Sequence, residues 1–498
     1  MAVSLCAGVV LALLVGFLPR RSPNVVLIVV DTLRASALST AIGNPETPNL
    51  AKLAAEATQF KFAFAHAPMT VPSHAALFSG RHPWETGVLN NGQDLPDDLP
   101  LLTEALRDNG YQTAAAVSLA TLWPRERLRG FDRGFDHYDN GELEVAPAQD
   151  TSARLRKTLD LLNPSEPFYL FAHFSDPHEP YNLHQGPDRI AEIVFDDERA
   201  AVVTTSKMSY WEAELELTPG LHRLVIRSGS AFKLRSLECS DERGPVVPRF
   251  VTGELLVPGT EISVELSNAG AAPTKLKVRA WLNDVPSLEE IHARYAAEVR
   301  EVDAAIGVLV AELEARDLWD NTLVVFTSDH GEALGEHGTV GHVVNLYDEL
   351  IHVPLLVRLP GGRQDDDLRL SSRGIARHVD ILPTILETLD IAPPDKIAGE
   401  SLFLVGERQL VAETHPPEAP RTLFCVRDQT YKLVFDPEAE SFEMYRLGPD
   451  PLELDNVYGH QGHLRKTWEL ILRRLAGEIE IDESRDEVAQ RRLSALGY

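Results

Sequence analysis

The segment from Val324 to Glu332 constrains the fold more than any other part of the chain. It begins as an apolar, β-branched run, which is typical of a strand buried on both faces of a parallel sheet. It ends in Asp329-His330-Gly331-Glu332, where the strand is expected to stop. Ligands of open α/β sheets bind just beyond the carboxyl ends of the strands, so this turn is expected to form part of a functional site.

Similar strand-like runs recur along the chain and alternate with helical stretches. The other expected strands are Val25–Val30, Thr113–Val117, Phe168–Phe174 and Pro354–Val357, and the segment above extends to Thr322–Thr327. Helical patterns are expected at Thr47–Ala57, at Leu99–Asn109 and, longest of all, at about Ser287–Arg316. This alternation predicts an α/β fold with a mostly parallel sheet covered by helices.

Two regions break the alternation. Between 189 and 286 the pattern has period 2, with Gly, Pro, Asn and Ser turns, which predicts an inserted β-sandwich. Its expected role is that of an accessory packing module, with substrate or glycan binding as the alternative. From 406 to 498, short strands and a closing helix at Leu464–Glu478 predict a small C-terminal α+β subdomain. The catalytic domain is therefore expected in two parts, 23–188 and 287–405.

Charge and cysteine content limit the ligands that the chain can bind. A length of 498 residues favours more than one domain, and a net charge of −28 argues against binding to nucleic acid or to an anionic membrane surface. A small anionic substrate then requires a local positive centre, which a metal ion supplies. The three cysteines have no CxxC spacing, so a cysteine zinc site and a dense disulfide framework are excluded.

Residues 1–22 are expected to be a signal or membrane-anchor segment. An uncharged apolar run from Ala2 to Leu18 precedes Pro19-Arg20-Arg21. We therefore expect an extracytoplasmic protein, whether periplasmic, secreted or held by a single membrane anchor. The alternative is a cytoplasmic protein, because the two arginines after the run favour a cytoplasmic body under the positive-inside rule.

The stretch Ala67–Arg81 contains the candidate nucleophile, Thr70. Pro72 is suited to the first turn of a helix, so Thr70 should stand at or just before a helix N-terminus. The helix dipole and the free N–H groups there favour an anion, such as an alkoxide or a bound phosphate or sulfate. The alternative is that Thr70 only caps the helix. A third polar cluster, Asp176-Pro177-His178, follows the strand expected at Phe168–Phe174.

Short motifs recur along the chain in a fixed order. They are the strand ending in Asp31, Thr47–Leu50, the Pro72-Ser73 pair after Thr70, Asp176–Tyr181, Asp329–Glu332, Leu346–Glu349 followed by Val353-Pro354, Tyr431–Leu433 and Asp450–Asn456. In this order they resemble the sulfatase family of the alkaline-phosphatase superfamily. The resemblance covers most of the chain outside the leader and the insert.

The chain departs from the family pattern at the positions that carry the chemistry. Sulfatases convert a cysteine, or sometimes a serine, of Cys-x-Pro-x-Arg to formylglycine, whereas this sequence has Thr70 at that position and His74 at the arginine's. The paired acids after the first strand are Asp31 and Thr32 here, so one calcium ligand is missing. His342 replaces the family's usual lysine.

The resemblance implies a metal site and a set of roles. Asp31, Thr70, Asp329 and His330 are similar to the metal ligands of phosphoethanolamine and phosphoglycerol transferases and of nucleotide pyrophosphatases. An imidazole ligand suits zinc or manganese, which are favoured over calcium or magnesium. The implied catalytic residues are Thr70, His178 and His342, and the implied substrate-binding residues are His74, Asp176 and His337.

These features predict a metal-dependent hydrolase of sulfate or phosphate esters. The metal would activate the Thr70 hydroxyl for in-line attack, and water would then release the esterified threonine. The expected substrate is a small anionic ester or a sulfated or phosphorylated glycan or lipid. Two alternatives are a transferase of phosphoethanolamine or phosphoglycerol type, in which an acceptor alcohol takes the group, and a catalytically silent family member.

Overall fold

The computed structural model describes most of the chain in two compact units. The described residues are 22–38, 46–124, 129–143, 145–178, 181, 190–196, 198–204, 209–228, 232–241, 244–245, 255–256, 261–268, 272–284, 288–362, 374–404, 408–416, 421–460 and 463–477. One unit consists of Met1–Pro177 and Val299–Tyr498, and the other of His178–Glu298. The leader expected at 1–22 lies outside the described residues except for Ser22. No helix among the described residues has the length and hydropathy required to cross a membrane.

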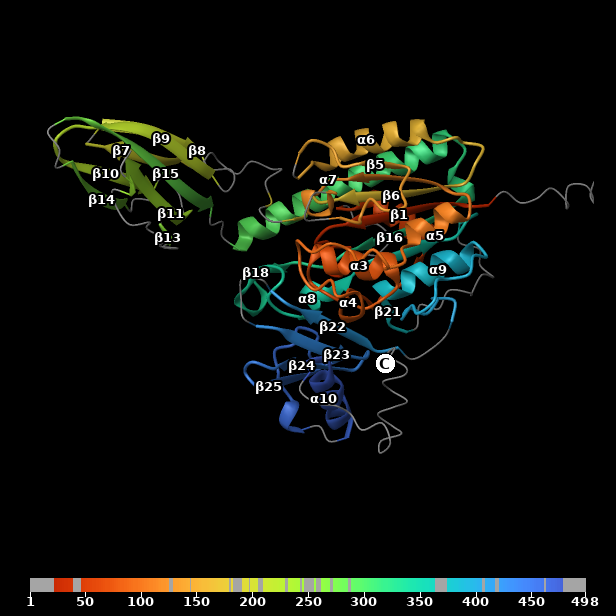
Figure 1. Ribbon diagram of the computed structural model, residues 1–498. Helices are drawn as coiled ribbons and strands as arrows, with labels where there is room; N and C mark the ends of the chain where they lie inside the picture. Colours follow the sequence, from red (N-terminus) through yellow and green to blue (C-terminus); the bar gives the residue numbers. More distant parts are fainter. Residues whose placement is uncertain are drawn as a thin grey trace, which may run out of the picture. The chain divides into compact units, whose positions relative to one another are not determined.

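A seven-stranded sheet forms the centre of the larger unit, in the order β2-β20-β16-β1-β6-β4-β5 (Figure 1). Its strands are β1 (Asn24–Val30), β2 (Thr58–Gln59), β4 (Gln112–Val117), β5 (His137–Asp139), β6 (Phe168–Phe174), β16 (Thr322–Ser328) and β20 (Leu355–Arg358). The pairs from β16 through β1, β6 and β4 to β5 are all parallel. The predicted α/β fold with a mostly parallel sheet is therefore confirmed.

The strand expected at Pro354–Val357 differs from the others in direction. β20 forms there, but it runs antiparallel to β16. At the edge of the sheet, β2 pairs with β20 and runs antiparallel to it. An apolar run shows that a strand is buried on both faces but does not show its direction. The connection from β16 to β20 contains the hairpin of β17 (Ala333–Leu334) and β18 (Val340–Gly341) and the short helix α8 (Asp348–Ile351), rather than a crossover helix that covers the sheet.

Helices cover both faces of this sheet. In Figure 1, α6 (Ala148–Leu161) and α7 (Leu288–Ala315) lie on one side of it and α3 (Thr70–Ser79), α5 (Leu102–Asp108) and α9 (Ile381–Thr388) on the other. The remaining helices of this unit are α2 (Pro48–Glu56), α4 (Pro83–Thr86) and α10 (His463–Leu475). Alternate side chains of β1 pack with α3, α5 and α9 in one hydrophobic core, while the others face the opposite side.

The register of the central strands explains why distant residues meet. Val30, the last residue of β1, is aligned with Ser328 of β16 on one side and with Phe174 of β6 on the other. The three strands therefore end together, and the residues that follow them leave the sheet at the same carboxyl edge. The polar residues that follow each of these strands in the sequence therefore lie at this edge.

Smaller sheets complete the larger unit. Beside the central sheet are β3 (Ala63–Phe64), β19 (His352–Val353) and β21 (Ala376–Arg377), and the hairpin of β17 (Ala333–Leu334) and β18 (Val340–Gly341). The C-terminal subdomain has a sheet of β22 (Leu410–Thr414), β23 (Leu423–Arg427), β24 (Tyr431–Asp436) and β25 (Ser441–Arg446). Helix α10 packs on this sheet through Trp468, Ile471 and Leu472.

The smaller unit contains the strands of the predicted insert. One sheet has the order β14-β10-β7-β8 and the other β12-β11-β15-β9, with β13 paired to β11. The bounds are β7 (Ile190–Phe195), β8 (Glu198–Thr204), β9 (Ser209–Leu217), β10 (Gly220–Ser228), β11 (Phe232–Asp241), β12 (Gly244–Pro245), β13 (Leu255–Leu256), β14 (Glu261–Asn268) and β15 (Thr274–Asp284). Leu224 and Leu266 of one sheet and Leu276 and Val278 of the other are buried, as expected of two sheets packed face to face.

Candidate active site

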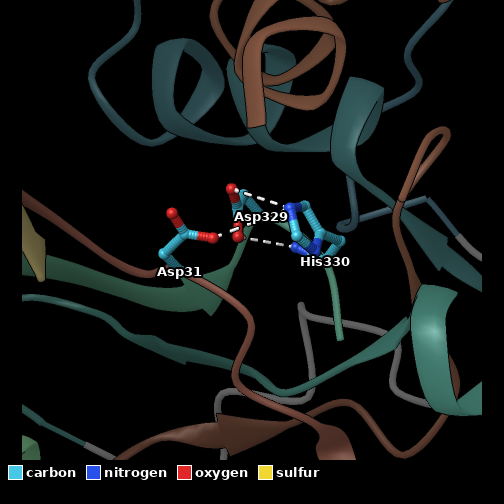
Figure 2. Close-up of side chains that lie close together, drawn as sticks. All are labelled: Asp31, Asp329 and His330. Atoms are coloured by element: carbon cyan, nitrogen blue, oxygen red, sulfur yellow. Dashed lines mark hydrogen bonds and ion pairs between the residues drawn. The ribbon is translucent and has the colours of Figure 1, made fainter. Parts of the chain in front are cut away.

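Three of the four predicted metal ligands meet at the carboxyl edge of the sheet (Figure 2). Asp31 follows β1, and Asp329 and His330 follow β16; one ligand atom from each lies within 4.8 Å of the others. The Nε2 atom of His330 is 3.6 Å from Asp31 Oδ1 and 3.6 Å from Asp329 Oδ2. All three side chains are fully buried. We call these three residues the metal set.

Hydrogen bonds orient the metal set and leave its inner atoms without partners. Asp329 Oδ1 accepts hydrogen bonds from the N–H groups of Thr32 (3.1 Å) and His330 (2.8 Å). The Nδ1–H of His330 donates to the carbonyl of Gly331 (2.9 Å), so the lone pair of the neutral ring is on Nε2. Both oxygens of Asp31, Asp329 Oδ2 and His330 Nε2 are buried without a hydrogen-bond partner.

This arrangement fits a divalent cation. Burying an unpaired carboxylate is unfavourable, so buried charges are normally paired or bound to a metal. One ligand atom from each of two carboxylates and one imidazole lie within 4.8 Å of one another, and this donor set suits zinc or manganese. The contact of His330 with the Gly331 carbonyl is the kind of second interaction that fixes the tautomer of a histidine ligand.

The pKa shifts of the metal set are also consistent with a site for a cation. Burial, together with the charges of Asp329 and Glu332, raises the pKa of Asp31 well above its usual value. Burial alone would also raise the pKa of Asp329, but His330 and His74 lower it to about 2. Burial lowers the pKa of His330 to about 4, so the ring is neutral at pH 7 and can act as a ligand. The raised pKa of Asp31 shows that its negative charge is unfavourable at this position unless a proton or a cation balances it.

Helix α3, whose first residue is Thr70, contacts this set, and the Thr70 hydroxyl as a fourth metal ligand remains a prediction. Thr70 is the first residue of the helix and is buried, and Met69 occupies the N-cap position, so the interpretation of Thr70 as the cap is wrong. The next turn contacts Asp329 directly: Ser73 Oγ donates to its carbonyl (2.5 Å), and His74 Nδ1 lies 3.7 Å from its Oδ2. His74 also contacts the Thr70 carbonyl (2.8 Å).

The N-terminus of α3 offers fewer donors to an anion than the sequence suggested. The N–H group of Val71 donates to Asn91 Oδ1 (2.9 Å), and Pro72 has no N–H group. Burial lowers the pKa of His74, which therefore adds no positive charge at pH 7. Positive charge at this edge must come from another source, which is consistent with a metal ion.

His342 is held beside the metal set by a residue to which the sequence assigned no role. Its Nδ1 lies 3.0 Å from Glu332 Oε2, and its ring centroid is 4.7 Å from that of His330. Glu332 is fully buried. The Glu332 carboxylate accepts from Nδ1–H, which leaves Nε2 of His342 to act as an acceptor or, when protonated, as a donor. The only sequence signal for Glu332 was its place in the Asp329–Glu332 motif.

Three predicted residues have other contacts in the structure. Asp176 Oδ1 accepts from the N–H group of Ala148 (2.7 Å) at the start of α6, and burial raises the pKa of Asp176 to about 7. His337 stacks on Tyr347 with ring centroids 3.6 Å apart. His178 is half-buried and begins the smaller unit. Substrate binding by Asp176 and His337 and catalysis by His178 remain predictions.

Two further residues brace the metal set without being recognisable from the sequence. Thr32 has a left-handed φ of 57°, and its hydroxyl donates to the Pro177 carbonyl (2.7 Å) while its N–H group contacts Asp329. Where the family has a second acid, this chain therefore has a residue that ties the β1 turn to the β6 turn. Ser73 Oγ also contacts His378 Nδ1 (2.9 Å), so His378 supports the serine that holds Asp329.

Comparison with known proteins establishes the family. The family model described as sulfatase matches residues 23–391, and the model described as N-sulphoglucosamine sulphohydrolase, C-terminal, matches residues 335–478. The chain belongs to the sulfatase family. It is therefore an ester hydrolase, as the sequence predicted.

Individual relatives are distant but match nearly the whole chain. N-acetylglucosamine-6-O-sulfatase of Bacteroides thetaiotaomicron is 25% identical over an alignment of 514 positions, gaps included. This alignment covers 91% of this chain and 85% of that protein. The structure of phosphonate monoester hydrolase of Agrobacterium radiobacter matches with a TM-score of 0.60 and 21% identity, over 93% of this chain and 98% of that one. A protein in complex with its substrate D-glucosamine-2-N,6-O-disulfate matches with a TM-score of 0.59 and 18% identity, over 92% and 98%. At such identities the structural matches establish the fold alone.

Proposed function

We propose that the protein is a metal-dependent hydrolase that cleaves sulfate or phosphate esters with Thr70 as the nucleophile. The observation that carries this proposal is that Asp31, Asp329 and His330 each bring one buried ligand atom within 4.8 Å of the others, next to the first turns of α3. A bound divalent cation supplies the positive charge that stabilises a deprotonated Thr70 hydroxyl and the anionic ester. Zinc or manganese is favoured, because one ligand is an imidazole.

The chain's own residues carry the remaining steps. Thr70 Oγ1 forms a bond to phosphorus or sulfur, and the bond from that atom to the leaving oxygen breaks. His342, oriented by Glu332, protonates the leaving oxygen, with His178 as a second donor. Water then attacks the same phosphorus or sulfur atom and releases Thr70 with its hydroxyl restored.

Thr70 restricts the chemistry in a way that formylglycine does not. A threonyl ester has no second hydroxyl through which to expel the bound group, so it must be cleaved at the P–O or S–O bond. This requirement favours phosphoryl substrates, to which the likeness to a phosphonate monoester hydrolase adds support. The relative that acts on N-acetylglucosamine 6-O-sulfate and the structure with a disulfated glucosamine support a sulfated glycan instead. We propose an anionic ester of a sugar or lipid headgroup as the substrate class.

A test of the nucleophile is the detection of its covalent adduct. The metal-loaded protein is mixed with aryl phosphate, aryl phosphodiester and aryl sulfate substrates, quenched in acid and digested, and the peptide containing Thr70 is analysed by mass spectrometry. One substrate should add a phosphoryl or sulfuryl group to this peptide. Thr70→Ala should lose both the adduct and turnover, whereas Thr70→Ser, which keeps a hydroxyl, should retain both. Unchanged turnover in Thr70→Ala eliminates the nucleophile assignment.

The transferase alternative is distinguished by the second half of the reaction. In a transferase, an acceptor alcohol rather than water takes the group from Thr70. Adding glycerol or ethanolamine to the assay should leave the product of a hydrolase as free phosphate or sulfate. An ester of the added alcohol would instead identify a transferase.

We propose an extracytoplasmic location on the basis of the apolar run at Ala2–Leu18. Expression of the full chain in a Gram-negative host, followed by separation of periplasm, membrane and cytoplasm, tests this. Recovery of the protein with the cytoplasmic marker alone would overturn it.

A further inference from the structure

The short helix α8 lies directly against the turn that carries His330. The N–H group of Gly331 donates to the Leu350 carbonyl (2.7 Å), and a Cβ atom at position 331 would lie 2.1 Å from the Glu349 carbonyl oxygen. The Gly331 carbonyl in turn accepts from Nδ1 of His330 (2.9 Å). The backbone of α8 therefore holds Gly331, whose carbonyl orients the His330 ring.

A charge group holds α8 in place, and we define this buried charge group as Arg427, Lys432 and Glu453 together with Asp348, whose side chain is 21% exposed. Asp348 is the first residue of α8, and its carboxylate lies 2.6 Å from Arg427 Nη1 and 3.0 Å from Lys432 Nζ. Lys432 Nζ also lies 2.8 Å from Glu453 Oε1, while Glu453 Oε2 accepts from the N–H group of Asp348 (2.6 Å). Both the side chain and the backbone at the start of α8 are thus bound.

Three members of the buried charge group belong to the C-terminal subdomain. Arg427 ends β23, Lys432 lies on β24, and Glu453 follows β25; their side chains are 2%, 0% and 1% exposed. Figure 1 shows this blue sheet beside α8. The Arg427 guanidinium also stacks 3.9 Å above the ring of Phe64 on β3. Two cations and two anions balance each other, so the group is stable only when all members are present.

We propose that the buried charge group is a positioning element of the metal site. It fixes α8, and α8 holds Gly331, whose carbonyl orients His330 toward the two carboxylates. The proposal rests on the proposed metal-dependent function, and Lys432 is its central residue because its ammonium contacts both carboxylates of the group. The C-terminal subdomain thereby sets the metal affinity of a site to which it contributes none of the metal set.

The proposal is tested with Lys432→Met and a matched control, Arg358→Met. Arg358 is also a buried cation, 2% exposed, and pairs with Glu56 (2.8 Å). It contacts the carbonyls of Trp319 and Thr322 at the start of β16, at the end of the strand opposite to Asp329. Both substitutions remove a buried cation, but only the one at Lys432 affects α8.

Two readouts are compared in full-length protein, at a temperature where circular dichroism shows each variant folded. Zn²⁺ and Mn²⁺ affinities are measured by competition with a chelator, and amide hydrogen exchange is measured for the peptide that contains Gly331. In Lys432→Met we expect a dissociation constant about 10–100-fold higher and faster exchange at Gly331. Arg358→Met should leave the dissociation constant within about twofold and the exchange at Gly331 unchanged. The double variant Lys432→Met/Glu453→Gln, which restores charge balance and keeps an acceptor for the Asp348 N–H group, should recover most of the affinity.

Each outcome decides the proposal. Unchanged metal affinity and unchanged exchange in a folded Lys432→Met protein overturn it, as does an equal loss of affinity in Arg358→Met. If Lys432→Met does not fold, Asp348→Asn carries the same expectation, because it removes the charge at α8 itself. If the wild-type protein binds neither metal, the proposed function fails, and the exchange at Gly331 alone decides whether the charge group positions the turn.

Discussion

Two clusters of buried ionisable side chains in the described structure differ in how their charges are balanced. In the buried charge group, every charge has an opposite charge within 3.0 Å. In the metal set, two carboxylates face a neutral imidazole. Three carboxylate oxygens and one imidazole nitrogen of this set have no hydrogen-bond partner. A structural path joins the two clusters, from Asp348 through α8 to Gly331.

The difference separates a cluster that stabilises the fold from one that is prepared for a ligand. A balanced, fully bonded group contributes its interactions whenever the chain is folded. An unbalanced group lowers the stability of the folded chain unless a proton or a cation balances it, and such groups are typical of functional sites. Substitutions in the two clusters should therefore have opposite effects on the metal-free protein.

The largest expected effect is the loss of activity in Asp31→Asn. This substitution removes a ligand charge and should lower kcat/KM by at least about a thousandfold, because metal charge stabilises a transition state by several kcal/mol. Elemental analysis of the purified variant should show substoichiometric metal. As a control, Asp94→Asn changes an exposed ion pair with Arg129 and should leave both values unchanged. Full activity of Asp31→Asn without metal would show that the metal set is not catalytic.

The next effect is on the stability of Lys432→Met. Removal of this fully buried cation leaves Glu453 and Asp348 with excess negative charge, and the free energy of unfolding should fall by about 3–5 kcal/mol. The measurement is urea denaturation in the presence of a chelator, so that metal binding does not contribute. A change below about 1 kcal/mol would mean that the buried charge group is not important for stability.

A smaller effect is expected for Glu332→Gln. The glutamine can still accept a hydrogen bond from His342 but no longer stabilises its protonated form, so kcat/KM should fall about 10–100-fold. The loss should be smallest for aryl esters with good leaving groups, because these need the least proton donation to the leaving oxygen. An equal loss for good and poor leaving groups would exclude His342 as the acid that Glu332 orients.

The local sequence was sufficient to predict the parts of the site that follow buried strands. Asp31 and Asp329 each end an apolar run, and parallel strands that pair in register bring their carboxyl ends together. His330 is adjacent to Asp329, so its position followed as well. The alternation of strands and helices similarly predicted the α/β fold and the boundaries of its main strands to within a residue or two.

Contacts that depend on tertiary packing could not be predicted. The bond between Ser73 and His378 joins residues 305 positions apart, and neither lies at the end of a periodic run. A polar residue after a strand can also have a structural role instead of a role in the site. Asp176 is an example, because its carboxylate accepts a hydrogen bond from the Ala148 N–H group at the start of α6. The antiparallel direction of β20 depends on its connection to β16, which the apolar pattern does not describe.

The smallest expected effect is a gain in metal-free stability in Asp31→Asn, and it depends on pH. Burial and neighbouring acids raise the pKa of Asp31 in the folded protein, so the protonated form is favoured there relative to the unfolded chain, where the pKa is about 3.9. The stability that this carboxyl contributes is complete below about pH 3.9 and is lost as the pH rises through the folded pKa. Asparagine has no charge and loses nothing over this range.

With a chelator present, the unfolding free energy of Asp31→Asn should therefore match that of the wild type near pH 4 and exceed it by about 1–3 kcal/mol near pH 8. Saturating metal should reverse the order, since metal at 1,000 times its dissociation constant adds about 4.1 kcal/mol to the wild type and little to the variant. Urea denaturation of both proteins at both pH values, with and without metal, gives the difference between them under all four conditions. If the wild type is the more stable protein at pH 8 even without metal, the negative charges of Asp31 and Asp329 are balanced within the chain, and the contrast between the two clusters is wrong.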